Sequence, residues 1–226
     1  MGCRVVFDVA VMQVDDESSA DRGEVTIVVG AILLSLTVAG SLLAFGGDAR
    51  EATRLALRTT ARLSFVYFLL AFVASPSARL RPGAASRWLV RRRRAFGVAF
   101  GASMTVHVGC ILRLYALYTP DRPPMVTDAD FLIGVPGLIL VALMTVTSAL
   151  IVRRRMSPVV WRRLHTVGLY VVWSIFFLCL VDSVARKEST HPIPAYGVFI
   201  LTLLAAMALR LTALRHTPSS PTAKVR

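Results

Sequence analysis

The stretch of sequence that decides the fold is RRRRAFGVAFGASMTVHVGCILRLYALY, residues 91–118. It opens with four consecutive arginines and continues as a long, mostly apolar run. An α-helix that crosses about 30 Å of hydrocarbon needs about 20 such residues, because each residue adds about 1.5 Å. We therefore expect a transmembrane helix over residues 95–118, with the arginines at one membrane surface.

Five further segments of the chain have a similar length and hydrophobicity. They cover residues 25–46, 60–76, 131–152, 166–184 and 195–214. Prolines fall mainly between these segments, where they interrupt helices at little cost, and Pro136 is an exception inside the fourth segment. The sequence therefore predicts an all-α, polytopic membrane protein whose six-transmembrane-helix bundle spans residues 25–214.

The composition excludes two other classes of protein. The 226 residues carry 26 Lys+Arg against 13 Asp+Glu, a formal net charge of +13, yet 55% of them are hydrophobic. A disordered basic tail would be poor in apolar residues, and a soluble nucleic-acid-binding protein would not need so many. We expect membrane lipid, and no nucleic acid, as a partner. The three cysteines form neither a disulfide framework nor a zinc motif.

The basic residues also predict an orientation. One membrane side would hold the N-terminus, the 77–94 and 153–163 loops and the C-terminal tail, and with them 18 of the 26 Lys+Arg. Basic residues concentrate on the cytoplasmic side of membrane proteins. Both termini are therefore predicted to be cytoplasmic, with residues 1–24 as a loose lead-in and 215–226 as a disordered tail.

Two histidines are candidate cofactor ligands. Ionisable groups inside a membrane helix are costly, so His107, in the middle of its segment, needs an explanation. Neutral imidazole is a common ligand of haem iron, and a helix bundle is a usual place for a cofactor. Alternatively, His107 forms a hydrogen bond to a neighbouring helix. His165 follows Trp161-Arg-Arg-Leu near the cytoplasmic surface and is either a ligand or simply solvated.

The depths of the two histidines indicate that they do not share one iron. His107 lies 13 residues beyond Arg94, or about 20 Å of helical rise. His165 lies two residues beyond Arg163, or about 3 Å. By depth, the partner of His107 on the fifth segment would be Leu178.

Further polar and small residues lie on the same two segments. Arg113 and Asp182 fall within about 3 Å of the same depth, so we expect them to form an ion pair, or Arg113 to hold an anionic group such as a haem propionate. Alternatively, both reach the outer interface. The Gly97-x-x-x-Gly101 pattern predicts close helix packing or the approach of a flat cofactor.

Several motifs together resemble the ferric-reductase-like transmembrane family. They are Arg93-Arg-Ala-Phe-Gly97 with His107, Thr60-Ala-Arg-Leu-Ser64 with Pro76, Arg122-Pro123, Thr147-Ser148, Arg154-Arg155, Trp161-Arg-Arg-Leu-His165 with Tyr170, and Pro194-x-Tyr196. Within the family, the chain is most similar to the haem-binding membrane subunit of the bacterial periplasmic methionine-sulfoxide reductase system.

The resemblance implies a function. It implies a six-helix bundle in a bacterial inner (plasma) membrane that binds haem b through His107 and His165. Electrons would pass from a separate cytoplasmic flavin or nicotinamide reductase to an extracytoplasmic acceptor protein. The sequence shows no dinucleotide-binding fingerprint that would supply electrons within the chain. The alternatives are a haem-free relative with a structural or interaction role, and a transporter, which only Pro136 suggests.

The chain departs from the family pattern at one position. The pattern places another histidine 13 residues after His165, where this sequence has Leu178, and leucine cannot bind iron. Three outcomes are open: a five-coordinate or differently ligated haem at His107, a distorted site that uses both histidines, or no haem. A five-coordinate haem would leave a site for a small ligand. Cys179 is expected to be a poor substitute, because one residue turns a helical side chain by about 100°.

Overall fold

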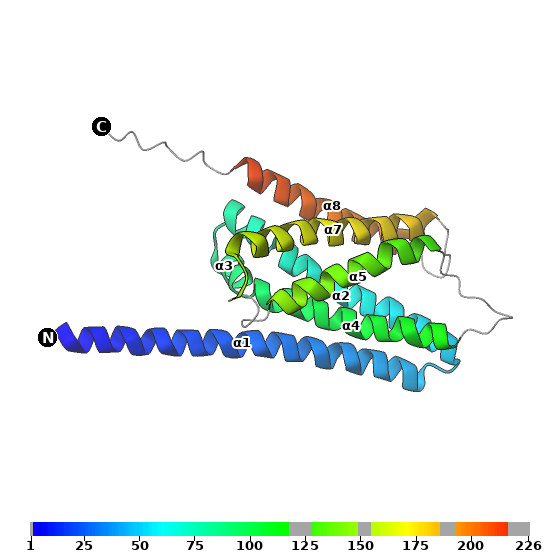
Figure 1. Cartoon of the computed structure of the whole chain (residues 1–226), viewed down its shortest axis with the longest axis horizontal. Helices are drawn as coiled ribbons and strands as arrows, with labels where there is room; N and C mark the ends of the chain where they lie inside the picture. The colour runs from blue at the N-terminus through cyan, green and yellow to red at the C-terminus, as the bar shows by residue number, and fades with distance from the viewer. Residues whose placement is uncertain (1, 118–127, 149–154, 186–192, 217–226) are drawn as a thin grey trace.

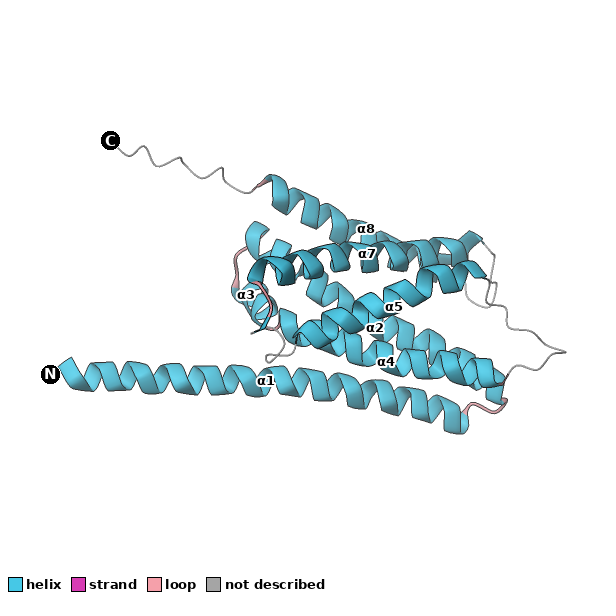
Figure 2. Ribbon diagram, in the orientation of Figure 1, coloured by secondary structure: helices cyan, strands magenta, loops and turns pink. Residues whose placement is uncertain are grey.

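The computed structural model describes residues 2–117, 128–148, 155–185 and 193–216, and the side chains of 22–117, 134–148, 155–185 and 196–216. Within these residues all regular structure is helical (Figure 2). The helices are α1 (Gly2–Phe45), α2 (Ala49–Leu80), α3 (Ala84–Arg91), α4 (Arg93–Ala116), α5 (Asp128–Ser148), α7 (Pro158–Ala185) and α8 (Ile193–Arg215).

The long helices lie side by side in one bundle (Figure 1). Helix α2 packs against α1, α4 and α8, while α5 packs against α4 and α7, and α7 against α8. Helix α1 lies on the outside of α2 and α4, and its N-terminal half projects beyond the bundle (Figure 1). The start of α1, the short helix α3 and the end of α8 lie at the same end of the bundle, which we call the arginine-rich end.

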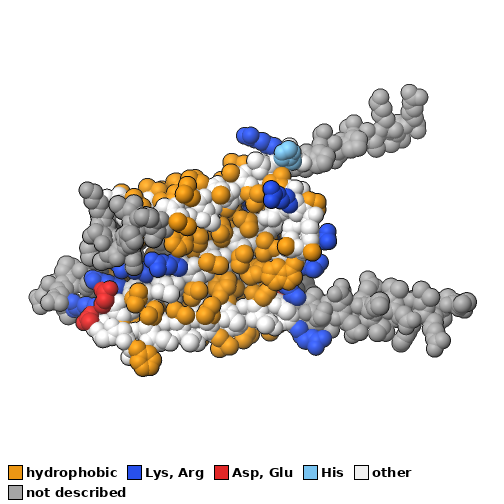
Figure 3. Space-filling view, turned by 180° about the vertical axis from the view of Figure 1, so that it is seen from behind, with side chains coloured by type: hydrophobic (Ala, Val, Ile, Leu, Met, Phe, Trp, Pro, Cys, Tyr) orange, Lys and Arg blue, Asp and Glu red, His pale blue; other side chains and the backbone are white. Residues whose placement is uncertain are grey.

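The protein is a multi-pass membrane protein. Five described helices are long and apolar enough to cross a membrane: Arg22–Phe45, Ala49–Leu80, Arg93–Ala116, Pro158–Ala185 and Tyr196–Arg215. Side chains of α5 are described only from Gly134 onward, and that part is a shorter apolar helix. Hydrophobic side chains cover the middle of the face shown in Figure 3, and Lys and Arg gather toward its ends. This distribution suits a protein surrounded by lipid.

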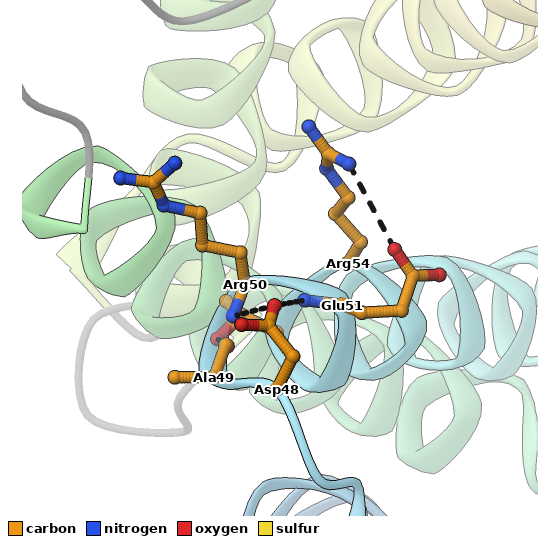
Figure 4. A network of polar contacts seen from close by, with 6 residues as sticks. Asp48, Ala49, Arg50, Glu51 and Arg54 are labelled. Atoms are coloured by element: carbon orange, nitrogen blue, oxygen red, sulfur yellow. Dashed lines mark hydrogen bonds and ion pairs between the residues drawn. The ribbon is translucent and has the colours of Figure 1, made fainter. Parts of the chain in front are cut away.

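Helix α2 is longer than the predicted segment 60–76. It begins at Ala49, because the Asp48 Oδ1 atom accepts hydrogen bonds from the backbone N–H groups of Arg50 and Glu51, both at 3.0 Å (Figure 4). Side-chain capping of this kind satisfies donors that have no partner within the helix. The first turns of α2 are polar, so hydropathy alone did not include them.

Two other segments differ from the sequence prediction. The structure continues α1 back to Gly2, through the lead-in that was expected to be loose. No proline or glycine stands between Cys3 and Arg22 to interrupt the helix. The 77–94 loop contains helix α3, which is too short and too polar to be detected as an apolar segment. The predicted disordered tail lies outside the described residues after His216.

Aromatic side chains pack in the centre of the bundle, and serine hydroxyls lie where α1 contacts it. Phe68 of α2 lies with its ring centroid 5.6 Å from that of Phe100 on α4 and 5.3 Å from that of Phe176 on α7. Helix α1 is joined to this core through Ser35, whose hydroxyl lies 3.1 Å from the Ser103 hydroxyl of α4. Hydroxyl contacts of this kind hold membrane helices together where no hydrophobic force acts between them.

Candidate cofactor site

A cavity of about 370 Å³ lies between α2, α4, α5, α7 and α8, in the half of the bundle away from α3. Its volume falls in the range of small-molecule and cofactor sites, about 300–1,000 Å³. The walls are mainly apolar, with His107 and a few other polar residues among the phenylalanine, isoleucine, leucine and valine side chains. Such a cavity suits a ligand with a large apolar body.

His107 faces this cavity from α4, and Thr60 of α2 holds its ring. The His107 Nδ1 atom lies 3.1 Å from the Thr60 Oγ1 atom. That hydroxyl lies 2.8 Å from the Ala56 carbonyl oxygen and 3.0 Å from the Leu57 carbonyl oxygen. The Thr60 hydroxyl has one hydrogen, and the Ala56 carbonyl, the Leu57 carbonyl and His107 Nδ1 all lie within reach of it. When a carbonyl takes that hydrogen, Thr60 accepts the hydrogen bond from His107 Nδ1–H.

One tautomer of the His107 ring suits a metal ligand. With the hydrogen on Nδ1, the Nε2 atom of the neutral ring carries a free lone pair. Histidines that bind metals almost always donate their other ring N–H to an acceptor, which sets the orientation of the ring. Thr60 Oγ1 is placed to be that acceptor for His107 Nδ1–H.

Two arginines contribute to the cavity lining from α2. Arg58 and Arg62 stand four residues apart, so both project from the same face of the helix. Two guanidinium groups beside an apolar cavity are complementary to a ligand that combines an apolar body with carboxylates. Sequence reasoning missed this pair, although its i, i+4 spacing on a membrane helix was a usable signal.

Arg113, which was predicted to hold an anionic group, does not line the cavity. Its Nε atom is buried without a hydrogen-bond partner. The predicted ion pair between Arg113 and Asp182 is not formed in the described part of the chain, where the ion pairs join other residues. The physical reason is the turn of the helix. Six residues rotate a side chain by about 600°, so Arg113 points about 120° away from His107, although its depth matches that of Asp182.

His165 lies in a different place. It lines a second cavity of about 40 Å³, far smaller than a cofactor site. Its Nε2 atom lies 3.2 Å from the Thr147 Oγ1 atom, and its ring packs on Trp161 at a centroid distance of 4.3 Å. His107 and His165 do not line one cavity, in agreement with the difference in depth deduced from the sequence.

An apolar wall separates the two cavities. Phe100, Val141 and Val172 contribute to the lining of both. The rings of Phe68 and Phe176 pack against Phe100, with centroid distances of 5.6 Å and 6.2 Å. Apolar side chains therefore close the cavity beside His107 on the side of the arginine-rich end.

Several of the other motif residues join helices at the arginine-rich end, while Arg122-Pro123 and Arg154 lie outside the described residues. Trp161 Nε1 donates to the Thr147 carbonyl at 3.1 Å, and Arg94 Nε donates to the Ser148 carbonyl at 3.0 Å. Arg210 Nε donates to the Tyr170 hydroxyl at 3.1 Å. These contacts connect α5 to α7, α4 to α5 and α8 to α7, so the motifs stabilise helix positions.

The glycine pattern on α4 serves helix packing at one of its two positions. A Cβ atom at Gly101 would overlap the side chain of Thr145 on α5. At Gly97 a Cβ atom would meet no other group within 4 Å, and this residue lines the small cavity beside His165. Gly101 therefore permits the close approach of α4 and α5.

Fold and site together define a multi-pass helical membrane protein with an interior cofactor-sized cavity. Residues 58–179, more than half of the chain, match the family described as the ferric reductase like transmembrane component. The chain belongs to this family, whose membership indicates a role in membrane electron transfer. The match runs from α2 into α7 and includes both His107 and His165. No curated protein and no solved structure matches the chain.

Proposed function

We propose that the protein is a membrane haem-b electron-transfer subunit with its haem in the cavity beside His107. The observation that carries this proposal is the position of His107: the residue lines a cavity of about 370 Å³, and its Nδ1 atom lies 3.1 Å from the Thr60 Oγ1 atom. A porphyrin supplies four nitrogen ligands itself, so a single protein imidazole is sufficient to hold its iron.

The lining residues fit the different parts of a haem. His107 would hold the iron through Nε2, and Arg58 and Arg62 would pair with the propionates. The apolar walls exclude water, and burial together with axial ligation sets the reduction potential. When bound, haem supplies reversible one-electron chemistry. His165, beside a cavity of about 40 Å³, is assigned to the packing of α5 and α7.

The orientation and partners are part of the same proposal. Helix α5 has 21 residues, which is about 31 Å and long enough for a sixth span. The arginine-rich end would face the cytoplasm of a bacterium, where a separate reductase donates electrons, and the cavity would face an extracytoplasmic acceptor. The relation to the haem subunit of the methionine-sulfoxide reductase system is the specific form of this proposal.

An absorbance spectrum of the purified protein, oxidised and then reduced with dithionite, tests the proposal. After expression with ample haem, we expect a Soret band and a reduced α band. His107→Ala should lose both bands, whereas the matched variant His165→Ala should keep them. A protein without a Soret band would overturn the proposal, and loss of haem only in His165→Ala would reverse the assignment of the ligand.

A second candidate function is that of a haem-free structural or interaction protein of the membrane. It is favoured by the cavity lining, in which His107 is the one histidine among the described residues, whereas the family pattern includes a second histidine ligand. The same spectrum separates the two candidates.

A further inference from the structure

The face that α7 turns toward the cavity is defined by the spacing of its lining residues. These are Val172, Ile175, Phe176, Cys179, Leu180 and Ser183. The spacing i, i+3, i+4, i+7, i+8, i+11 is that of a single helical face. Cys179 belongs to this face. Leu178 is turned by about 100° from Cys179 and does not line the cavity, and both side chains are exposed.

This register corrects the expectation drawn from the sequence. Leu178 matches His107 in depth, but a side chain at that position does not line the cavity. Cys179 differs in depth by only about 1.5 Å and lines the same cavity as His107. Position 179 is therefore where α7 would have to present a second axial ligand.

Cys179 itself is poorly suited to bind the iron. Cysteine binds metals as the thiolate, and the neighbours of Cys179 on this face of α7 include the apolar residues Ile175, Phe176 and Leu180. Its side chain is also shorter than that of histidine. Met104, the other sulfur in the lining, stands on α4 one turn before His107, on the same side of the cavity as His107.

The wall that α5 contributes has free space at one of its two glycines. Helix α5 contributes Gly134 and Gly137 to the lining. A Cβ atom at Gly134 would meet nothing within 4 Å, whereas one at Gly137 would overlap the side chain of Ile175 on α7.

We propose that the haem iron is held by His107 alone and that its other face is a binding site for a small uncharged ligand of the CO, NO or O₂ type. This inference rests on the proposed function. The site is bounded by position 179 of α7 and by the glycines of α5, and its ligand reaches it through an apolar cavity. The iron is therefore five-coordinate and high-spin when no such ligand is bound.

Two neighbouring histidine substitutions provide a matched test in the full-length, haem-loaded protein. Wild type and Cys179→Ala should both give high-spin spectra and bind CO in the reduced state. Cys179→His should convert the haem to a low-spin, six-coordinate form and lose CO binding. Leu178→His adds the same side chain one position earlier, and it should keep the wild-type spectrum and bind CO.

Several results would overturn the inference. A low-spin wild type that does not bind CO would show that the second face is already occupied, and a changed spectrum in Cys179→Ala would identify the thiol as the ligand. Conversion by Leu178→His but not by Cys179→His would show that the register of α7 is different. Haem that is present but six-coordinate defeats only this inference, whereas absence of any Soret band defeats the proposed function and this inference with it. The wild-type spectrum decides the matter even if Cys179→His fails to fold.

Discussion

The hydrogen bond between Thr60 and His107 allows the sharpest test of the site. Thr60→Val keeps the shape of the side chain and removes the hydroxyl that lies 3.1 Å from His107 Nδ1. The ring would then lose the side-chain contact with α2 that orients it beside the cavity. We expect weaker haem binding, with the helix bundle itself retained.

The size of the effect separates two roles for Thr60. Hydrogen bonds between membrane helices contribute about 0.6 kcal/mol on average, which corresponds to a change of about threefold. Removing the partner that orients a metal-binding histidine reduces metal affinity by about 10- to 100-fold. We therefore expect the dissociation constant for haem to rise by at least about tenfold in Thr60→Val, or about 1.4 kcal/mol.

The assay is a haem titration of the apoprotein in detergent, followed by absorbance. Thr60→Ser restores the hydroxyl and should return the affinity to within about threefold of wild type. The control is Thr59→Val, because the Thr59 hydroxyl bonds only locally, to the Leu55 carbonyl at 2.8 Å. Equal affinities in Thr60→Val and Thr59→Val would refute the reasoning, and so would an effect of Thr60→Val that Thr60→Ser does not reverse.

The other predictions concern charge and packing. Replacing Arg58 and Arg62 together by Gln should weaken haem binding by about 10-fold or more, since charge-assisted hydrogen bonds contribute about 1.5–3 kcal/mol, whereas Arg54→Gln on the same helix should leave it unchanged in the same titration. Gly101→Val should destabilise the bundle by about 1–3 kcal/mol, because its side chain would overlap Thr145. Gly97→Ala should be tolerated, and thermal unfolding in detergent measures both.

The sequence was informative about properties that depend only on the position of a residue along its helix. Crossing hydrocarbon requires about 20 apolar residues, so hydropathy along the chain was enough to predict the membrane segments. An ionisable group in such a segment is costly, and this singled out His107. Depth along a helix follows from residue number, so the separation of His107 and His165 was also predictable.

The sequence was less informative about the face on which a side chain lies. Arg113 and Leu178 were both chosen because their depth fits, yet neither lines the cavity, whereas Arg62 and Cys179 do. The rotation of a helix about its axis depends on packing against several neighbours at once. Residue spacing within one helix does not reveal it. Thr60 was quoted only as part of a motif, because its contact with His107 joins residues 47 positions apart.

The serine contact of α1 has a consequence for the biogenesis of the protein. The Ser35 hydroxyl finds its partner at Ser103, 68 residues later in the chain. At a synthesis rate of about 5–20 residues per second, α1 exists for about 3–14 s before that partner has been made. During this interval the hydroxyl has only the carbonyls of its own helix to bond, as serine does in membrane helices. Helix α1 must therefore persist as an independent span first and dock onto α2 and α4 in a second stage.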